Sequence, residues 1–175
     1  MPVSRRSLYH GRIVDFGIES ITQPDGRTLE IEVVRHPGGA AVVALDGNGR
    51  ICLLRQFRAP LEDWLWELPA GKIDPPEPPE ETARRELEEE AGLRAGTWRS
   101  LGAIVTCPGF CDEILHLYLA TDLQPAPSRP EDDEFIEVHW WPLERAVEQA
   151  RNGGLSDGKT VAAVLRAGAL LEAAR

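Results

Sequence analysis

The feature that most constrains this chain is a proline-rich loop that leads into an acidic segment ending at a glycine. Residues 74–79 contain four prolines, residues 80–91 contain neither proline nor glycine, and half of these twelve are glutamates. Gly92 follows directly. Proline is tolerated in the first turn of a helix, and glycine is favoured just past the last turn. The sequence therefore predicts a helix over 80–91.

Apolar stretches on both sides of this helix predict strands. Before it, the clearest strands are 31–34 and 40–45, and 51–57 is expected to pair back on 40–45 across the turn signal at 46–49. The segments after the helix are predicted strands at 97–105, 113–120 and 136–141, and then helices at 143–151 and 160–174, where apolar residues recur at helical spacing.

The length and composition fit one domain of mixed α and β structure. With 175 residues, 42% of them hydrophobic, the chain can bury a continuous core but not two full ones. We expect the domain to span 9–175, behind a loose tail at 1–8. The formal charge of −10 disfavours duplex nucleic acid and anionic membranes as partners, because both repel an acidic surface.

The cysteines and the apolar runs bear on where the protein acts. Three cysteines are an odd number, and a chain of this length needs no disulfide to close its core, which favours a reducing, cytoplasmic setting. The basic residues at the N-terminus have no apolar stretch behind them, and no run of about eighteen apolar residues occurs. The sequence therefore predicts neither secretion nor a membrane span.

The glutamates of the predicted helix are arranged in a way that suits a cation. Glu86 and Glu90 are four residues apart and Glu89 is three beyond Glu86, so the three carboxylates project from nearly the same side. Their mutual repulsion would be reversed by a hard divalent cation, which takes oxygen ligands. Helix composition alone leaves a second interpretation open, a solvated acidic face in which Arg85 pairs with Glu89 and Arg84 with Glu88.

A longer pattern decides between these interpretations. Gly71 is followed after five residues by Glu77, and after seven more by the run Arg-Glu-Leu-Glu-Glu-Glu-Ala-Gly-Leu at 85–93. Every fixed position of the Nudix box is filled, in the loop-and-helix context that this motif needs. The chain thus resembles the Nudix hydrolase family.

The resemblance extends beyond the box, from about residue 9 to 165. The segments 55–58 and 66–71, the proline Pro108 fifteen residues past the box, the stretch 131–138 and the late 157–160 look like the ADP-ribose pyrophosphatase branch. This resemblance implies an α/β/α sandwich with a mixed sheet, and an N-terminal strand region, 9–45, that contributes to a homodimer. It also implies hydrolysis of ADP-ribose to AMP and ribose 5-phosphate, dependent on Mg²⁺ with Mn²⁺ as a substitute.

The family pattern assigns roles to residues around the box. Glu86 and Glu90, with the backbone carbonyl of Ala70, correspond to magnesium ligands, and Glu89 assists a further ion. Arg85 ties the loop to the helix by a charge-assisted contact with Glu77, and we count it with Glu89 among the catalytic residues. Gly71 provides backbone geometry that a side chain would obstruct, and Gly92 ends the helix.

The catalytic base is expected on a loop well after the box. The family alignment points to Glu134, although its acidic neighbours at 131–133 are chemically equivalent candidates.

Two arginines and a glutamate are candidates for binding the substrate. Arg58 matches an arginine that approaches the diphosphate, and Arg55 is equally eligible. Glu113 is a candidate for contact with the terminal ribose or a metal, and Asp112 beside it would serve as well. The substrate is expected to be a small nucleoside diphosphate derivative.

Two rival functions remain open at this stage. One keeps the chemistry and changes the substrate to another nucleotide sugar or a dinucleotide. The other is a non-catalytic sensor that binds ADP-ribose. Glu86, Glu89 and Glu90 are all present, which favours an enzyme, because sensors built on this fold tend to lose box glutamates.

Overall fold

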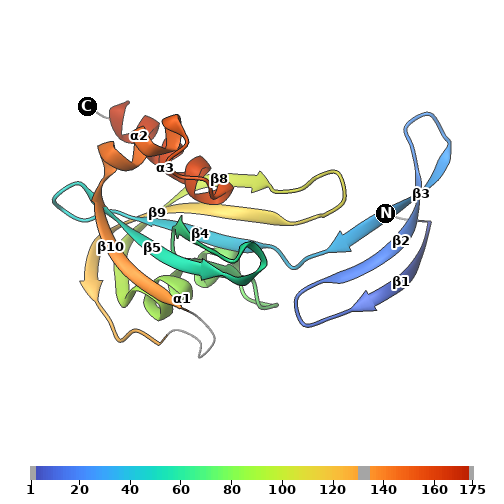
Figure 1. The fold of residues 1–175 in the computed structure, drawn as a ribbon, viewed down its shortest axis with the longest axis horizontal. Helices are drawn as coiled ribbons and strands as arrows, with labels where there is room; N and C mark the ends of the chain where they lie inside the picture. The colour runs from blue at the N-terminus through green and yellow to red at the C-terminus, as the bar shows by residue number, and fades with distance from the viewer. Residues whose placement is uncertain (1–2, 130–134, 174–175) are drawn as a thin grey trace. The chain divides into compact units, whose positions relative to one another are not determined.

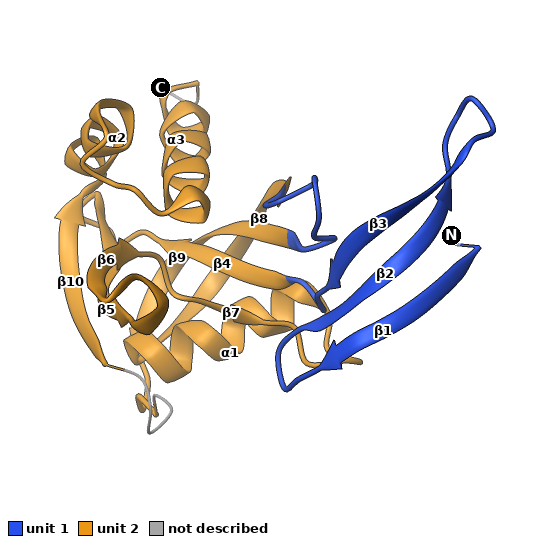
Figure 2. Cartoon of the chain, turned by 45° about the vertical axis from the view of Figure 1, so that its right-hand side comes forward, with its two compact units in different colours: residues 1–38, 105–114 blue, residues 39–104, 115–175 orange. Residues whose placement is uncertain are grey.

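The computed structural model describes residues 3–129 and 135–173 and divides into two compact units, shown in Figure 2. Unit 1 comprises residues 1–38 and 105–114, and unit 2 comprises residues 39–104 and 115–175. The three helices are α1 (Pro79–Ala91), α2 (Leu143–Asn152) and α3 (Gly158–Glu172), and a 3-10 turn, η1, covers Ala59–Leu61.

Unit 1 is built on a three-stranded antiparallel sheet in the order β1-β2-β3. Its strands are β1 (Ser4–His10), β2 (Asp15–Thr22) and β3 (Thr28–Arg35). Residues 4–8, expected as part of a loose tail, form most of β1, because their backbone groups pair with β2 from Ser4 opposite Ser20 onward. The fully buried carboxylate of Glu19 holds this sheet together through ion pairs with Arg5 and Arg35.

Unit 2 contains two sheets. A mixed sheet has the order β7-β4-β9-β8, with β4 and β9 parallel, and an antiparallel sheet has the order β10-β5-β6. The strands are β4 (Gly39–Ala44), β5 (Arg50–Arg58), β6 (Asp63–Glu67), β7 (Ala70–Lys72), β8 (Leu93–Val105), β9 (Ile114–Pro125) and β10 (Ile136–Pro142).

Strand β4 lies between two hydrophobic cores, and its alternating side chains enter them in turn. Ala41 and Val43 pack with residues of α2 and α3, whereas Val42 packs with Ala83 and Leu87 of α1. Figure 1 accordingly shows α1 on one side of the strands and α2 with α3 on the other. The predicted α/β class, with helices on both faces of a mixed sheet, is confirmed.

One predicted strand pairing is wrong. The segments 40–45 and 51–57 do form strands, β4 and β5, but they share only an isolated bridge, from Leu45 to Ile51, and continue in different sheets. β4 is buried at all six positions and pairs with β7 and β9, so both of its edges are taken. The turn signal at 46–49 therefore predicted the chain reversal correctly, but it did not identify the strands that pair with β4.

The predicted helices are confirmed to within a few residues. α1 begins one residue earlier than expected and ends before Gly92, which has a φ of 64° and donates its backbone N–H to the carbonyl of Glu88. Asp157 caps α3 by accepting a hydrogen bond from the backbone N–H of Thr160. Among the described residues, the helices are too short or too polar to cross a bilayer.

Candidate active site

The carboxylates of α1 lie where the helix meets the backbone of β7. Ala83 and Leu87 are fully buried and fix the helix against β4, and the same packing keeps Glu86 and Glu90 only 9% and 4% exposed. Oε2 of Glu90 accepts a hydrogen bond of 2.8 Å from the backbone N–H of Ala70. The structure thus brings the first residue of β7 against a buried helix glutamate.

Gly71 gives Glu86 the space for its side chain. A Cβ atom at Gly71 would lie 1.8 Å from Oε1 of Glu86 and 2.1 Å from its Cδ, far inside any allowed contact. The carboxylate of Glu86 therefore rests on the bare backbone of Gly71. Four positions singled out from the sequence, Ala70, Gly71, Glu86 and Glu90, lie together.

Arg85 links the loop before α1 to the carboxylates on the helix. Its Nη1 donates to Glu86 at 2.6 Å and to Glu89 at 3.0 Å, and its Nη2 donates to Glu77 and to the carbonyl of Lys72, both at 3.2 Å. Burial lowers the pKa of Arg85, but the hydrogen bond to Glu77, the charge of Glu86 and the hydrogen bonds to Glu89 and Glu86 outweigh it and raise this pKa above its usual value. The contact expected between Arg85 and Glu77 is present, and the same guanidinium also orients Glu86 and Glu89.

The donor set fits a divalent cation that keeps part of its own hydration. Among the described residues, no three His, Cys, Asp or Glu side chains gather as a ready-made ligand cluster. Glu86 and Glu90 are one helical turn apart and almost buried beside the backbone of Ala70, which offers hard oxygen donors from few residues. Mg²⁺ is characteristically held by one or two carboxylates and completes its shell with water and substrate phosphate oxygens.

Arg58, at the end of β5, is held by a buried carboxylate from β6. Its Nε and Nη2 donate to the two oxygens of Glu67 at 2.6 and 2.7 Å, and Lys159 of α3 contacts the same carboxylate. The hydrogen bond to Glu67, and then the charges of Glu67, Glu90 and Asp157, raise the pKa of Arg58 despite its burial. Glu67 is three residues before Ala70, whose backbone N–H bonds to Glu90, so Arg58 is tied to the segment that leads to the carboxylates of α1.

Arg55 is differently placed, which separates the two arginine candidates. Its guanidinium lies 5.0 Å from the ring centroid of Trp64 and 3.4 Å from a carboxylate oxygen of Glu137. Trp66 packs its ring against Trp141, with centroids 4.7 Å apart. In these contacts Arg55 is directed at an aromatic ring, whereas Arg58 is held by the buried carboxylate of Glu67.

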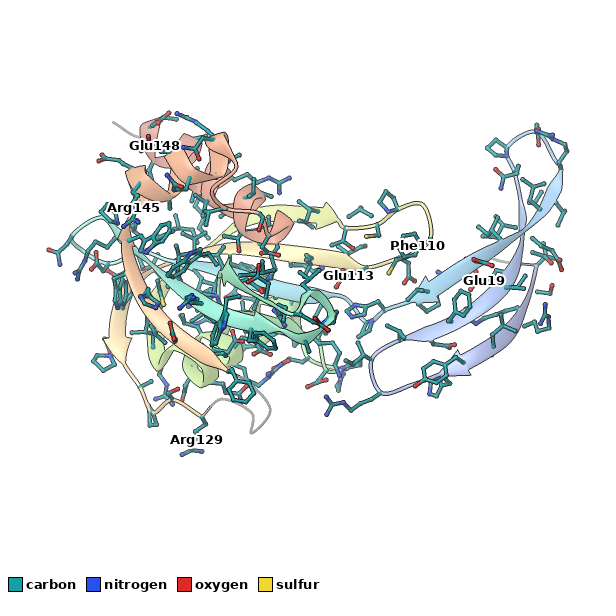
Figure 3. The ribbon with its side chains drawn as sticks, in the orientation of Figure 1. Glu19, Phe110, Glu113, Arg129, Arg145 and Glu148 are labelled. Atoms are coloured by element: carbon teal, nitrogen blue, oxygen red, sulfur yellow. The ribbon has the colours of Figure 1, made fainter. Side chains whose placement is uncertain are left out.

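Glu113, which is labelled in Figure 3, and its neighbour Asp112 have their partners within unit 1. Glu113 accepts a hydrogen bond of 2.7 Å from the hydroxyl of Thr106 and lies 3.3 Å from Nδ1 of His36. Asp112 pairs with Arg35 at 2.8 Å. Glu134, the expected base, lies outside the described residues.

Sequence reasoning missed the buried ion pair between Glu67 and Lys159. Both lie in segments that resemble the family, but nothing in their residue types indicates a buried ion pair across 92 positions of the chain. The sequence signal for this ion pair was weak. Glu67 is a charged residue inside an otherwise apolar segment, and Lys159 is a charged residue inside a turn-forming segment.

The comparisons with known proteins agree with this geometry. The NUDIX domain family model matches residues 35–164. An ADP-ribose pyrophosphatase of Bacillus subtilis is 39% identical over 164 residues, and a methanol dehydrogenase activator of Bacillus methanolicus is 37% identical over the same length, each alignment covering 93% of this chain and 89% of the relative. The crystal structure of an ADP compounds hydrolase superposes with a TM-score of 0.84 over 99% of this chain and 95% of the other, at 20% identity, which shows a shared fold.

Proposed function

This chain belongs to the NUDIX domain family, and from that premise we propose that it hydrolyses the diphosphate of ADP-ribose to AMP and ribose 5-phosphate. The family resemblance and the hydrolase class predicted from the sequence are confirmed. The substrate proposal is supported by the relative in Bacillus subtilis, an ADP-ribose pyrophosphatase that aligns over most of both chains.

The convergence of Glu86 and Glu90 on the backbone of Ala70 and Gly71 is the observation that carries the proposal. Bound there, a divalent cation would neutralise charge on the phosphate oxygens and lower the pKa of a coordinated water. We assign Mg²⁺ to this position, with Mn²⁺ as a substitute. Glu86 and Glu90 would hold the cation together with the backbone carbonyl of Ala70, and Glu89 would assist a further ion.

The other assigned residues bind the substrate or orient the carboxylates of the site. Arg58, held by Glu67 three residues before Ala70, can contact the substrate diphosphate through a planar guanidinium, which suits bidentate binding of phosphate oxygens. Arg85 keeps Glu86 and Glu89 in fixed orientations through its hydrogen bonds. Glu113 and Arg55 stay weaker candidates for substrate contact.

We keep Glu134 as the proposed general base, on the resemblance of the acidic residues 131–134 to the family pattern. Glu134→Gln removes the basic oxygen and preserves size, so ADP-ribose should still bind while turnover falls by about a hundredfold. Single-turnover kinetics together with equilibrium binding separate the two effects. Unchanged turnover would move the base to another carboxylate of the loop.

A substrate panel tests the proposed activity. ADP-ribose, UDP-glucose, GDP-mannose, NADH and diadenosine polyphosphates are incubated with the protein and Mg²⁺, and the products are separated by chromatography. We expect AMP release chiefly from ADP-ribose. Preference for another compound would support diphosphate hydrolysis but contradict ADP-ribose as the main substrate. Binding of ADP-ribose without any cleavage would indicate a sensor.

Two further proposals concern assembly and location. We propose that the strand region 9–45 contributes to a homodimer, within one functional domain at 9–175. A monomeric mass in sedimentation would contradict the dimer.

A cytoplasmic setting is supported by three cysteines that are all free thiols, Cys52, Cys107 and Cys111. Fractionation of cells that express the tagged protein tests the location.

A further inference from the structure

We propose that Glu67 is a positioning residue that fixes the guanidinium of Arg58 for binding a diphosphate, and that the N-terminal turn of α3 holds both in place. This inference rests on the proposed function, because it concerns the same site. It assigns a role to the segment 157–160. This segment is part of the family resemblance, but the proposed chemistry does not use it.

The contact between the two side chains leaves one edge of Arg58 for a ligand. Glu67 accepts hydrogen bonds from Nε and Nη2, which form one edge of the planar guanidinium group. Nη1 lies outside that edge and is directed away from the carboxylate. The Glu67 side chain is 2% exposed and the Arg58 side chain is 39% exposed. The pair is therefore anchored in the interior and reaches the surface through the arginine.

The pairing of Glu67 with Arg58 both neutralises charge and fixes geometry. A buried carboxylate is costly unless it is paired, but Lys159 already contacts the same oxygen of Glu67 from a side chain that is only 11% exposed. Lys159 also lies 3.0 Å from Asp157. Because Lys159 is shared between Glu67 and Asp157, Arg58 completes the charge balance of the cluster. Its two-point contact with Glu67 also fixes the guanidinium of a long side chain that would otherwise sample many rotamers.

The same turn of α3 holds the backbone that leads to Ala70. The hydroxyl of Thr160 accepts a hydrogen bond of 2.9 Å from the backbone N–H of Leu68 and donates one of 2.6 Å to Asp157. Leu68 is two residues before Ala70. Segment 157–160 thus positions the Arg58 side chain through Glu67 and the β6–β7 connection through Leu68.

A double-mutant cycle with ADP as the probe tests this proposal. ADP carries a diphosphate, and its affinity can be measured by calorimetry without turnover. We expect Glu67→Gln to weaken ADP binding about tenfold in the parent protein, the effect of losing a charge-assisted contact, and less than twofold when Arg58 is already alanine. A purely structural role of Glu67 would weaken binding equally in both backgrounds, and that result would overturn the proposal.

A matched control is available on α1. Glu88 accepts from Nε and Nη2 of Arg94 at 2.6 and 2.7 Å, the same geometry as the Arg58–Glu67 pair but on an exposed face. Glu88→Gln should leave ADP affinity within twofold of the parent. If Glu67→Gln does not fold, Arg58→Lys keeps the charge but loses the two-point contact; a tenfold loss of affinity supports the proposal, and parent-like affinity overturns it.

The cycle also distinguishes this inference from the proposed function. A protein that does not cleave ADP-ribose but shows the non-additive loss of ADP affinity would contradict the substrate and keep the role of Glu67. Cleavage of ADP-ribose together with additive losses of ADP affinity would support the proposed substrate and contradict the role of Glu67.

Discussion

Glu90→Gln is expected to lower the turnover of ADP-ribose by about a thousandfold while the protein stays folded. Glutamine has nearly the same shape and can still accept the hydrogen bond from the backbone N–H of Ala70 through its amide oxygen. What it cannot supply is the negative charge that a cation requires. The loss should therefore appear in kcat and in metal affinity, and thermal unfolding should change little.

The comparison variant for Glu90→Gln is Glu88→Gln, two positions away on the same helix. It removes an equal charge from a side chain that pairs with Arg94 outside the proposed cation position. We expect turnover within twofold of the parent. Parent-like turnover in Glu90→Gln, measured at saturating ADP-ribose and Mg²⁺, would contradict the assignment of Glu90 as a metal ligand.

Gly71→Ala should reduce turnover by more than a hundredfold, since it places a methyl group in the space occupied by the Glu86 carboxylate. At 1.8 Å from Oε1 the two groups cannot coexist, so the side chain of Glu86 must rotate away from its position. The end of a side chain can move more easily than backbone, and the fold should survive. Activity is thus lost through a displaced ligand rather than through unfolding.

Gly47→Ala is the matched control for this substitution. A Cβ at Gly47 meets no atom within 4 Å, so neither stability nor turnover should change. Mg²⁺ titration followed by calorimetry would show weaker binding in Gly71→Ala and parent-like binding in Gly47→Ala. If both alanine variants bind Mg²⁺ and turn over as the parent does, Gly71 does not act by making room for Glu86.

The helix and its glutamates could be predicted because the signals are local. Prolines before residue 80 and Gly92 after residue 91 mark both ends of α1, and the spacing of Glu86 and Glu90 follows from helix geometry. Strand pairing was less accessible. The turn after Leu45 was predicted correctly, but whether β4 pairs with β5 depends on competition from β7 and β9, which lie elsewhere in the sequence.

The buried ion pair between Glu67 and Lys159 could not be predicted. Glu67 and Lys159 meet only because α3 packs its first turn on the β6–β7 connection, and a buried ion pair has no pattern of its own in a sequence. The motif placed Arg85 next to Glu77, and helical spacing suggested its pair with Glu89, but its further contact with Glu86 had no signal in the sequence. Local geometry was thus predictable, and long-range charge pairing was not.

The release of AMP from ADP-ribose, followed with Mg²⁺ and again after addition of a chelator, tests the central claim most directly. The arrangement of Glu86, Glu90 and the backbone of Ala70 predicts steady AMP release with the metal, loss of turnover with the chelator, and recovery when Mg²⁺ is restored. AMP release that continues undiminished in excess chelator would contradict the claim that these carboxylates act by holding a divalent cation.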